Sequence, residues 1–301
     1  MAIAGARLPF PLPSRVALLE RTVSMCHPPY AEQVTLTRPD EAQRHAIAKI
    51  TSVRTGPAHA QRLRLPEGHG LLLFHGDVSS PRPAELLLVG PCTYVTTHPA
   101  ADAHEFVALR LQPGMLHALA GRPAHELADR KLEATALLGS WLRDRLMDAP
   151  GPLERHALLE GLVTARLRTL SGRDLVCVAA CDLIERSGGR LSGKELGRAT
   201  GYSARHLRDL FLQHLGLPPK VFARIVRFRA VLAALGTEPR PSWAALAIQH
   251  GYCDQSHLIN AFIGFTGRTP QAFLADPHLV GALAWDGAVR PAAKPLPLTR
   301  G

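Results

Sequence analysis

Two stretches decide the fold: GYSARHLRDLFLQHLGLPPKVF at residues 201–222 and GYCDQSHLINAFIGFTGRTPQAF at residues 251–273. A His-Leu pair, a phenylalanine, a glycine, a proline and a second phenylalanine recur in both at the same spacing, 51 residues apart. Upstream, Leu196 recurs as Leu246 at an offset of 50. A repeat of this length predicts one structural unit that is used twice.

Each copy predicts a helix, a tight turn and a second helix. In the first copy, Ser192 and Glu195 fit a capping box, and we expect the helix that follows to reach Thr200. Gly201 can adopt the left-handed conformation that a sharp turn needs, and Ser203 then caps the second helix. The second copy repeats the cap, the buried leucine, the turn and the stop at Ser242, Leu246, Gly251 and Gly267.

Two helices joined by a short turn with glycine form a helix-turn-helix, whose second helix can enter a DNA major groove. A connecting helix is predicted over residues 219–235, and at 1.5 Å per residue it spans roughly 25 Å. Together with its flanking turns it can place two recognition helices about one DNA turn apart, roughly 34 Å. The repeat therefore favours binding to neighbouring major grooves on one face of double-stranded DNA.

At these residues the chain resembles the AraC/XylS family of transcriptional regulators. The resemblance covers about Asp174 to Leu274, and its most specific part is the segment G-Y-x-D-Q-S-H-L at residues 251–258. It implies an all-α domain of two helix-turn-helix units joined by a long helix, with sequence-specific DNA binding and no cofactor. In this family an N-terminal ligand-binding domain often precedes the DNA-binding domain.

The expected DNA-binding residues lie on the two second helices and at the start of the connecting helix. Arg205 and Arg208 can bind guanine through two hydrogen bonds, and Gln255 and Asn260 can read adenine. Asn260 occupies a position at which the family often has arginine, and residues 254–266 contain no Lys or Arg. We therefore expect the first unit to supply most of the binding energy. The full set is Ser203, Ala204, Arg205, Arg208, Asp209, Lys220, Arg224, Gln255, Ser256, Ile259 and Asn260.

The charge is distributed as DNA binding requires. The formal net charge is +10. Residues 1–170 carry 19 Lys and Arg against 16 Asp and Glu, whereas residues 171–275 carry 13 against 7. The basic excess thus coincides with the repeat, where it can neutralise phosphates.

The N-terminal half is expected to be an α+β domain, a small β sandwich or barrel with flanking helices. Residues 1–40 contain six prolines and little periodicity, which predicts a poorly ordered extension. Short apolar segments bounded by Gly, Pro and Asp predict the strands Ala48–Val53, Leu71–Phe74, Leu86–Val89, Tyr94–Thr97 and Phe106–Leu111. A looser resemblance, carried by residues 107–114 and 126–129, is to sensor domains found ahead of such helix-turn-helix pairs.

Helices are predicted from Pro113 to Gly121, after Pro123, from Leu132 to Met147 and from Pro152 to Leu170. The third carries an apolar stripe, for which we favour a place in the core over a dimer contact, although periodicity alone cannot distinguish the two: Leu137, Leu138, Trp141, Leu142 and Leu146. We thus divide the chain into an extension (1–40), a sensor or dimerisation domain (41–170), a DNA-binding domain (171–275) and a flexible tail (276–301).

Residue patterns that indicate an enzyme are missing from the sequence. Eight histidines lie between His45 and His125, but without His-x-His or His-Glu-x-x-His spacing, and there is no Gly-x-Ser-x-Gly motif. Among five cysteines, Cys177 and Cys181 stand one helical turn apart; they are either small buried residues or, less expectedly, a redox switch or half a metal site. We expect no catalytic, cofactor-binding or metal-binding residues.

The leading hypothesis is a cytoplasmic, sequence-specific DNA-binding regulator whose N-terminal domain responds to an effector. The alternative is a DNA-binding regulator whose N-terminal domain is only a dimerisation or protein-interaction module without a ligand. No apolar run approaches the ~20 residues that span a bilayer, and we expect no membrane partner. The partners to be considered are double-stranded DNA, a small-molecule effector, a second copy of the chain and RNA polymerase.

Overall fold

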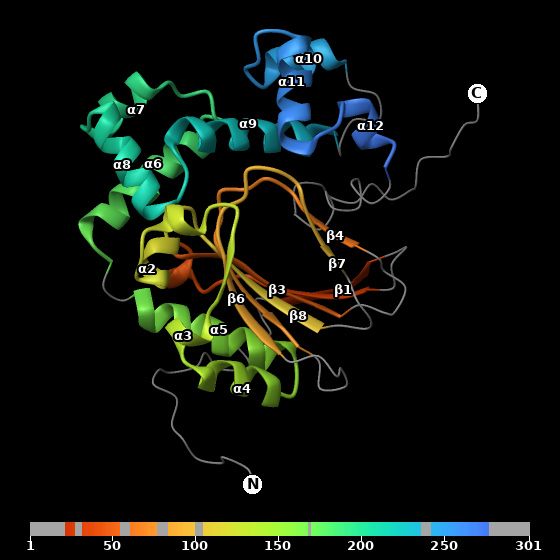
Figure 1. The fold of residues 1–301 in the computed structure, drawn as a ribbon, viewed down its shortest axis with the longest axis vertical. Coiled ribbons are helices and arrows are strands. Elements are labelled where there is room, and N and C mark those ends of the chain that lie inside the picture. The colour runs from red at the N-terminus through yellow and green to blue at the C-terminus, as the bar shows by residue number, and fades with distance from the viewer. Residues whose placement is uncertain are drawn as a thin grey trace.

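The computed structural model describes residues 22–27, 32–54, 61–76, 84–99, 105–167, 170–235 and 242–276. Antiparallel sheets with covering helices make up the N-terminal half, and helices alone make up the C-terminal half (Figure 1). The α+β architecture expected from the sequence is thereby confirmed. Across these ranges, no helix is long and apolar enough to cross a bilayer.

The main sheet has seven antiparallel strands in the order β1-β2-β3-β8-β5-β6-β9. A second sheet pairs β4 with β7. The strands are β1 (Thr22–His27), β2 (Glu32–Thr37), β3 (Ile47–Arg54), β4 (Gln61–Arg64), β5 (Leu71–His75), β6 (Glu85–Val89), β7 (Thr96–Pro99), β8 (Glu105–Leu111) and β9 (Lys131–Glu133).

The structure corrects two parts of the sequence interpretation. The poorly ordered extension assigned to residues 1–40 is wrong for residues 22–27 and 32–37, which form β1 and β2 and pair in the main sheet. Neither of these two strands contains a proline, so the prolines of this region do not exclude β-structure there. The expected strand Tyr94–Thr97 is shifted, since β7 begins at Thr96.

The second correction concerns residues 132–147, which were expected to form one helix. They contain the end of β9, then α3 (Thr135–Leu138) and most of α4 (Ser140–Asp148). Gly139 separates the two helices with a φ of 93°, a conformation that an α-helix excludes. The apolar stripe nevertheless faces the core, because Leu138, Leu142 and Leu146 are buried and Leu137 and Trp141 pack against them.

The remaining N-terminal helices are η1 (Glu41–Gln43), α2 (Leu116–Ala120), η2 (Ala124–Leu127) and α5 (Pro152–Arg166). Apolar residues of α2, η2 and α5 pack in the same core as the main sheet. Helix α5 packs against β3 and β8. His156 on α5 is fully buried between the hydroxyl of Thr37 at 2.6 Å and that of Ser52 at 2.7 Å. Burial lowers the pKa of His156 to about 3. This polar cluster attaches α5 to β2, a strand that the sequence interpretation had placed in the extension.

The C-terminal half contains α6 (Gly172–Arg186), α7 (Gly193–Thr200), α8 (Ala204–His214), α9 (Pro219–Leu235), α10 (Trp243–Gln249), α11 (Gln255–Thr266) and α12 (Pro270–Leu274). Ser192 and Glu195 form the expected capping box. Gly201 and Gly251 have φ values of 75° and 74°, which confirms both left-handed turns. The pairs α7–α8 and α10–α11 stand at the two ends of α9 (Figure 1).

Each half of the molecule has its own apolar core, and residues of the N-terminal half also pack into the core of the C-terminal half. Leu65 belongs to the apolar cluster of the C-terminal helices. A Cβ added to Gly68 would lie 2.2 Å from the ring of Phe222, so the loop backbone rests directly on α9. Farther along, the amide of Val95 donates a 2.9 Å hydrogen bond to the carbonyl of Phe265 at the end of α11. The N-terminal domain therefore contacts both the connecting helix and the second helix-turn-helix unit.

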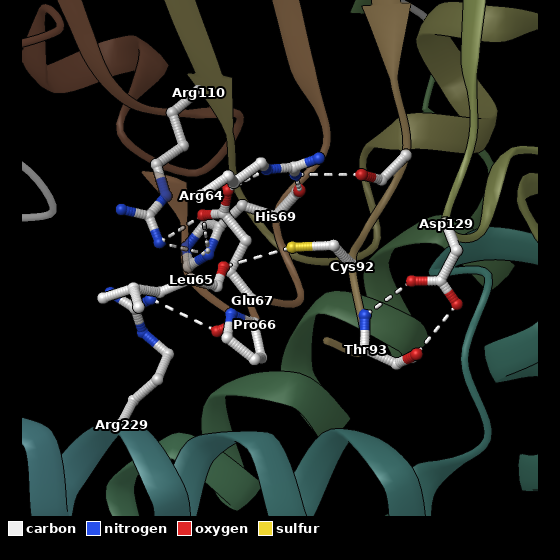
Figure 2. A network of polar contacts seen from close by, with 11 residues as sticks. Arg64, Leu65, Pro66, Glu67, His69, Cys92, Thr93, Arg110, Asp129 and Arg229 are labelled. Atoms are coloured by element: carbon white, nitrogen blue, oxygen red, sulfur yellow. Dashed lines mark hydrogen bonds and ion pairs between the residues drawn. The ribbon is translucent and has the colours of Figure 1, made fainter. Parts of the chain in front are cut away.

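A buried carboxylate, that of Glu67, organises this contact (Figure 2). It receives 2.7 Å contacts from Arg64 Nε and Arg110 Nη2, while Arg229 of α9 reaches the neighbouring carbonyl of Pro66 at 3.3 Å. Burial alone would raise the pKa of Glu67, but the charges of Arg110, Arg64 and Arg229 outweigh it and hold the pKa at about 2. The carboxylate stays ionised at the point where the two halves meet.

The cysteines whose side chains are described are free thiols. Cys92 is buried beside Glu67 and donates a hydrogen bond to the carbonyl of Leu65, and burial raises its pKa to about 11. Cys177 and Cys181 are buried in the core of the C-terminal helices, as the interpretation as small buried residues requires. Within the described ranges, no group of three His, Cys, Asp or Glu could hold a metal ion.

The buried histidine predicts acid sensitivity. In the unfolded chain His156 binds a proton below pH 6.5, whereas in the folded protein it does so only near pH 3. Stability is therefore lost as pH falls from about 6.5, at roughly 1.4 kcal/mol per pH unit for one proton. Between pH 6 and pH 4, the free energy of unfolding of His156→Gln should fall by about 2 kcal/mol less than that of the wild type. Urea unfolding of both proteins at a series of pH values measures this difference. If their free energies of unfolding changed in parallel with pH, the prediction would be contradicted.

The two left-handed glycines predict a second stability effect. Gly201→Val and Gly251→Val should each cost on the order of 1 to 3 kcal/mol through backbone strain. Gly251→Val should cost more, because its Cβ would lie 2.8 Å from Arg190 Cγ, whereas no atom lies within 4 Å of a Cβ at Gly201. Thermal unfolding tests this with Gly193→Val as control, since Gly193 has neither a positive φ nor a close neighbour. Unchanged melting in both turn variants would contradict the turn assignment.

Candidate nucleic-acid interface

The two second helices begin at side-chain caps. At the start of α8, Ser203 Oγ accepts the amide of His206 at 3.2 Å. At the start of α11, the carboxylate of Asp254 accepts the amide of His257 at 2.7 Å. The positive end of the helix dipole stabilises that carboxylate. Asp254 thus serves as the cap of α11.

In the first unit the predicted residues share one exposed surface. Leu207, Leu210 and Phe211 are buried beneath α8. In the described part of the chain, no hydrogen bond or ion pair engages the guanidinium groups of Arg205 and Arg208, so both can reach a ligand. The exposed set is Ser203, Ala204, Arg205, Arg208 and Asp209.

In the second unit the corresponding surface carries no basic side chain. Gln255, Ser256 and Asn260 are exposed, whereas Ile259 is half-buried and thus faces outward only in part. Leu258 is buried under the helix, as its counterpart is in the first unit. The exposed surface of α11 therefore offers uncharged hydrogen-bonding groups and no Lys or Arg.

The two predicted residues of the connecting helix are both exposed and lie one helical turn apart on the same face of α9. Lys220 lies in the first turn of α9. Arg224 lies one turn farther, with its guanidinium 5.4 Å from the ring centre of Phe265 on α11. The predicted residues therefore form three groups: the start of α8, the start of α9 and the exposed side of α11. Arg224 joins the second of these groups to the third.

Two exposed histidines extend this surface, and the sequence interpretation did not include them. His206 stacks on Tyr202 with ring centres 4.6 Å apart. His257 packs edge-on against Tyr252, and its Nδ1 accepts the amide of Cys253 at 3.3 Å. Because a backbone amide can only donate, the neutral ring carries its proton on Nε2. The signal was present, since the histidine is one of the positions that recur in the repeat.

Helix α8 is also held from the N-terminal side. His214, near the end of α8, lies 2.7 Å from Asp174 of α6 and edge-on to the ring of His117 of α2, with ring centres 4.7 Å apart. Burial lowers the pKa of His214, although Asp174 acts in the opposite direction. A Cβ on Gly216 would lie 2.7 Å from the carbonyl oxygen of Ala124. The orientation of α8 is thus fixed by both halves of the molecule.

Comparison with known proteins gives matches for both halves. Residues 196–276 match a family described as a helix-turn-helix domain, and residues 37–133 match a domain of unknown function, DUF6597. No curated protein matches the chain significantly.

Among solved structures the chain is similar to two forms of ToxT. For ToxT from Vibrio cholerae O395 the identity is 10%, the match covers 76% of this chain and 97% of that chain, and the TM-score is 0.39. For wild-type ToxT from Vibrio cholerae strain SCE256 with bound unsaturated fatty acid, the identity is 9%, the match covers 84% of this chain and 97% of that chain, and the TM-score is 0.36. The repeat, its two left-handed turns and the matched family together show that the C-terminal part of this chain is an AraC-type helix-turn-helix domain.

Proposed function

We propose that this protein is a sequence-specific DNA-binding transcriptional regulator and not an enzyme. One observation carries the proposal: two helix-turn-helix units stand at the ends of α9, and each exposes the first turns of its second helix. Arg205 and Arg208 supply charge and paired donors at the first of these surfaces. Gln255 and Asn260 supply uncharged donors and acceptors at the second. A regulator of this kind works on DNA in the cytoplasm.

We further propose that residues 171–275 read DNA and that residues 41–170, together with β1 and β2, respond to a small-molecule effector. The contacts of the N-terminal domain with α8, α9 and α11 support this, because a shift in that domain would move the DNA-binding helices. The alternative, a dimerisation or protein-interaction module without a ligand, has less support. One contact that such a module could have used, the apolar stripe of α3 and α4, lies in the core. Contacts with a second copy or with RNA polymerase remain expectations from the family resemblance.

Selection from a random-sequence duplex library with the full-length protein tests the DNA-binding proposal. We expect enrichment of two short motifs about one helical turn apart, roughly 10 base pairs between centres. Affinity for the selected duplex should fall steeply with salt, because phosphate contacts release counterions. Equal affinity for selected and unselected duplexes would contradict sequence-specific binding.

A second experiment separates the effector from the interaction module. Full-length protein is screened against small molecules by thermal unfolding, and each stabilising compound is then tested for its effect on DNA affinity. Because coupling between two sites is reciprocal, a true effector must change DNA affinity by the factor by which DNA changes effector affinity. A protein that dimerises and whose DNA affinity no compound changes would favour the module.

The difference in charge between the two recognition helices predicts unequal contributions to DNA affinity. Arg208→Ala should lose about 1 to 3 kcal/mol of binding energy and relax preference at one base pair, whereas Asn260→Ala should lose less. Both are measured on the selected duplex at one salt concentration. Arg186→Ala is the matched control, because Arg186 is exposed on α6 and pairs only with Asp182 among the described residues. A greater loss for Asn260→Ala on several duplexes would overturn the asymmetry.

A further inference from the structure

One arginine of the connecting helix joins the two helix-turn-helix units, and it belongs to neither recognition helix. Arg227 donates from Nη1 to the carbonyl of Gly251 at 2.9 Å and from Nη2 to the carbonyl of Gly189 at 2.8 Å. Its guanidinium also lies 5.5 Å from the ring centre of Tyr252. Gly189 stands in the loop between α6 and α7, and Gly251 stands in the turn between α10 and α11. A single planar group therefore holds one loop from each unit.

The loop of the first unit rests on the backbone of α9. Gly189 has a φ of 73°, and a Cβ there would lie 2.2 Å from the carbonyl oxygen of Ala223 and 3.0 Å from the amide nitrogen of Arg227. Only a residue without a side chain permits this approach. The loop is thereby placed one helical turn before Arg227, within reach of its guanidinium.

The turn of the second unit is held from two sides. Arg227 binds its carbonyl at Gly251, and the side chain of Arg190 covers the same glycine, with Cγ 2.8 Å from the position of an added Cβ. Arg190 Nη1 also lies 3.5 Å from the carbonyl oxygen of Gln249. Residues of the first unit's leading loop and of the second unit's turn therefore meet beside α9.

The other contacts between α9 and the second unit are apolar and less directional. Phe228 packs against Phe262 and Phe265 with ring centres 5.0 and 4.7 Å apart. Ring contacts of this kind resist separation but tolerate a range of angles. Hydrogen bonds require alignment of donor and acceptor, and the arginine fork presents its donors at fixed angles. Among these contacts, the bridge through Arg227 restricts rotation of the second unit most.

We infer that Arg227 is a positioning residue that sets the distance and rotational phase between the two recognition helices, and so the spacing of the two half-sites that the protein accepts. The inference rests on the proposed DNA-binding function. One base pair added between the half-sites turns the second site by roughly 34° about the duplex axis. A protein whose two recognition helices are held at a fixed relative rotation loses the contacts of its second unit on such a duplex. A protein whose second unit can rotate keeps contact with the displaced half-site.

The test measures the affinity of full-length protein for the duplex selected by the wild type, and for versions with one base pair inserted or removed between the half-sites. The wild type should lose on the order of tenfold in affinity on each altered duplex. Arg227→Lys keeps the positive charge but loses the two parallel donors of the guanidinium. On each altered duplex, this variant should lose only about threefold or less in affinity. Arg186→Lys, the same substitution at an exposed position of α6, should keep the wild-type spacing profile.

The thermal unfolding of each variant is also measured. The affinities for the selected duplex and for the duplexes of altered spacing are compared only for variants that are folded at the assay temperature. If Arg227→Lys melts below the assay temperature, Arg227→Gln takes its place, because it retains a planar amide donor of smaller reach. A folded variant with the wild-type spacing profile would overturn the inference alone. A wild type that selects no duplex would overturn the proposed function and the inference together.

Discussion

Enclosure of the connecting helix is the constraint on which the rest of the structure depends. Phe222 faces the N-terminal domain across Gly68, and Phe228 faces the second helix-turn-helix unit. Arg227 lies between the two units, and Arg229 reaches the loop at Pro66. Because α9 contacts its neighbours on several sides, movement of any one neighbour would expose apolar surface or break hydrogen bonds between α9 and the others. The helix therefore couples three bodies that the sequence presents as separate segments.

The buried charges add little to the stability of this coupling, but they favour one arrangement of the two halves. Glu67 from the N-terminal domain and Glu185 from α6 both interact with Arg110 and Arg229. Burial raises the pKa of Glu185, and the two arginines counter that effect. Taking such groups out of water is costly, so the cluster adds little net stability compared with apolar packing. Separating the halves would, however, pull opposite charges apart, which favours this one docking arrangement.

Local signals predicted most of the C-terminal half. Capping boxes and left-handed glycines depend on residues only a few positions apart, so Ser192 with Glu195, and Gly201, were identified from the sequence. The two repeated helix pairs, α7–α8 and α10–α11, followed from the recurring residues. The pairing of β1 and β2, the break at Gly139 and the bridge through Arg227 depend on partners distant in sequence or on a single backbone angle. Periodicity carries no information about such contacts, and the same limit hid the cluster around Glu67.

The contact between Gly68 and Phe222 bears on how freely the two halves could be exchanged between proteins. An interface formed by long side chains adapts to a new neighbour through rotamer changes, but a bare backbone seated on an aromatic ring cannot. A chimaera that carries this DNA-binding domain under a foreign N-terminal domain would need a glycine and a loop of the same shape at that point. The two halves are therefore expected to have diversified together, as a matched pair instead of as interchangeable modules.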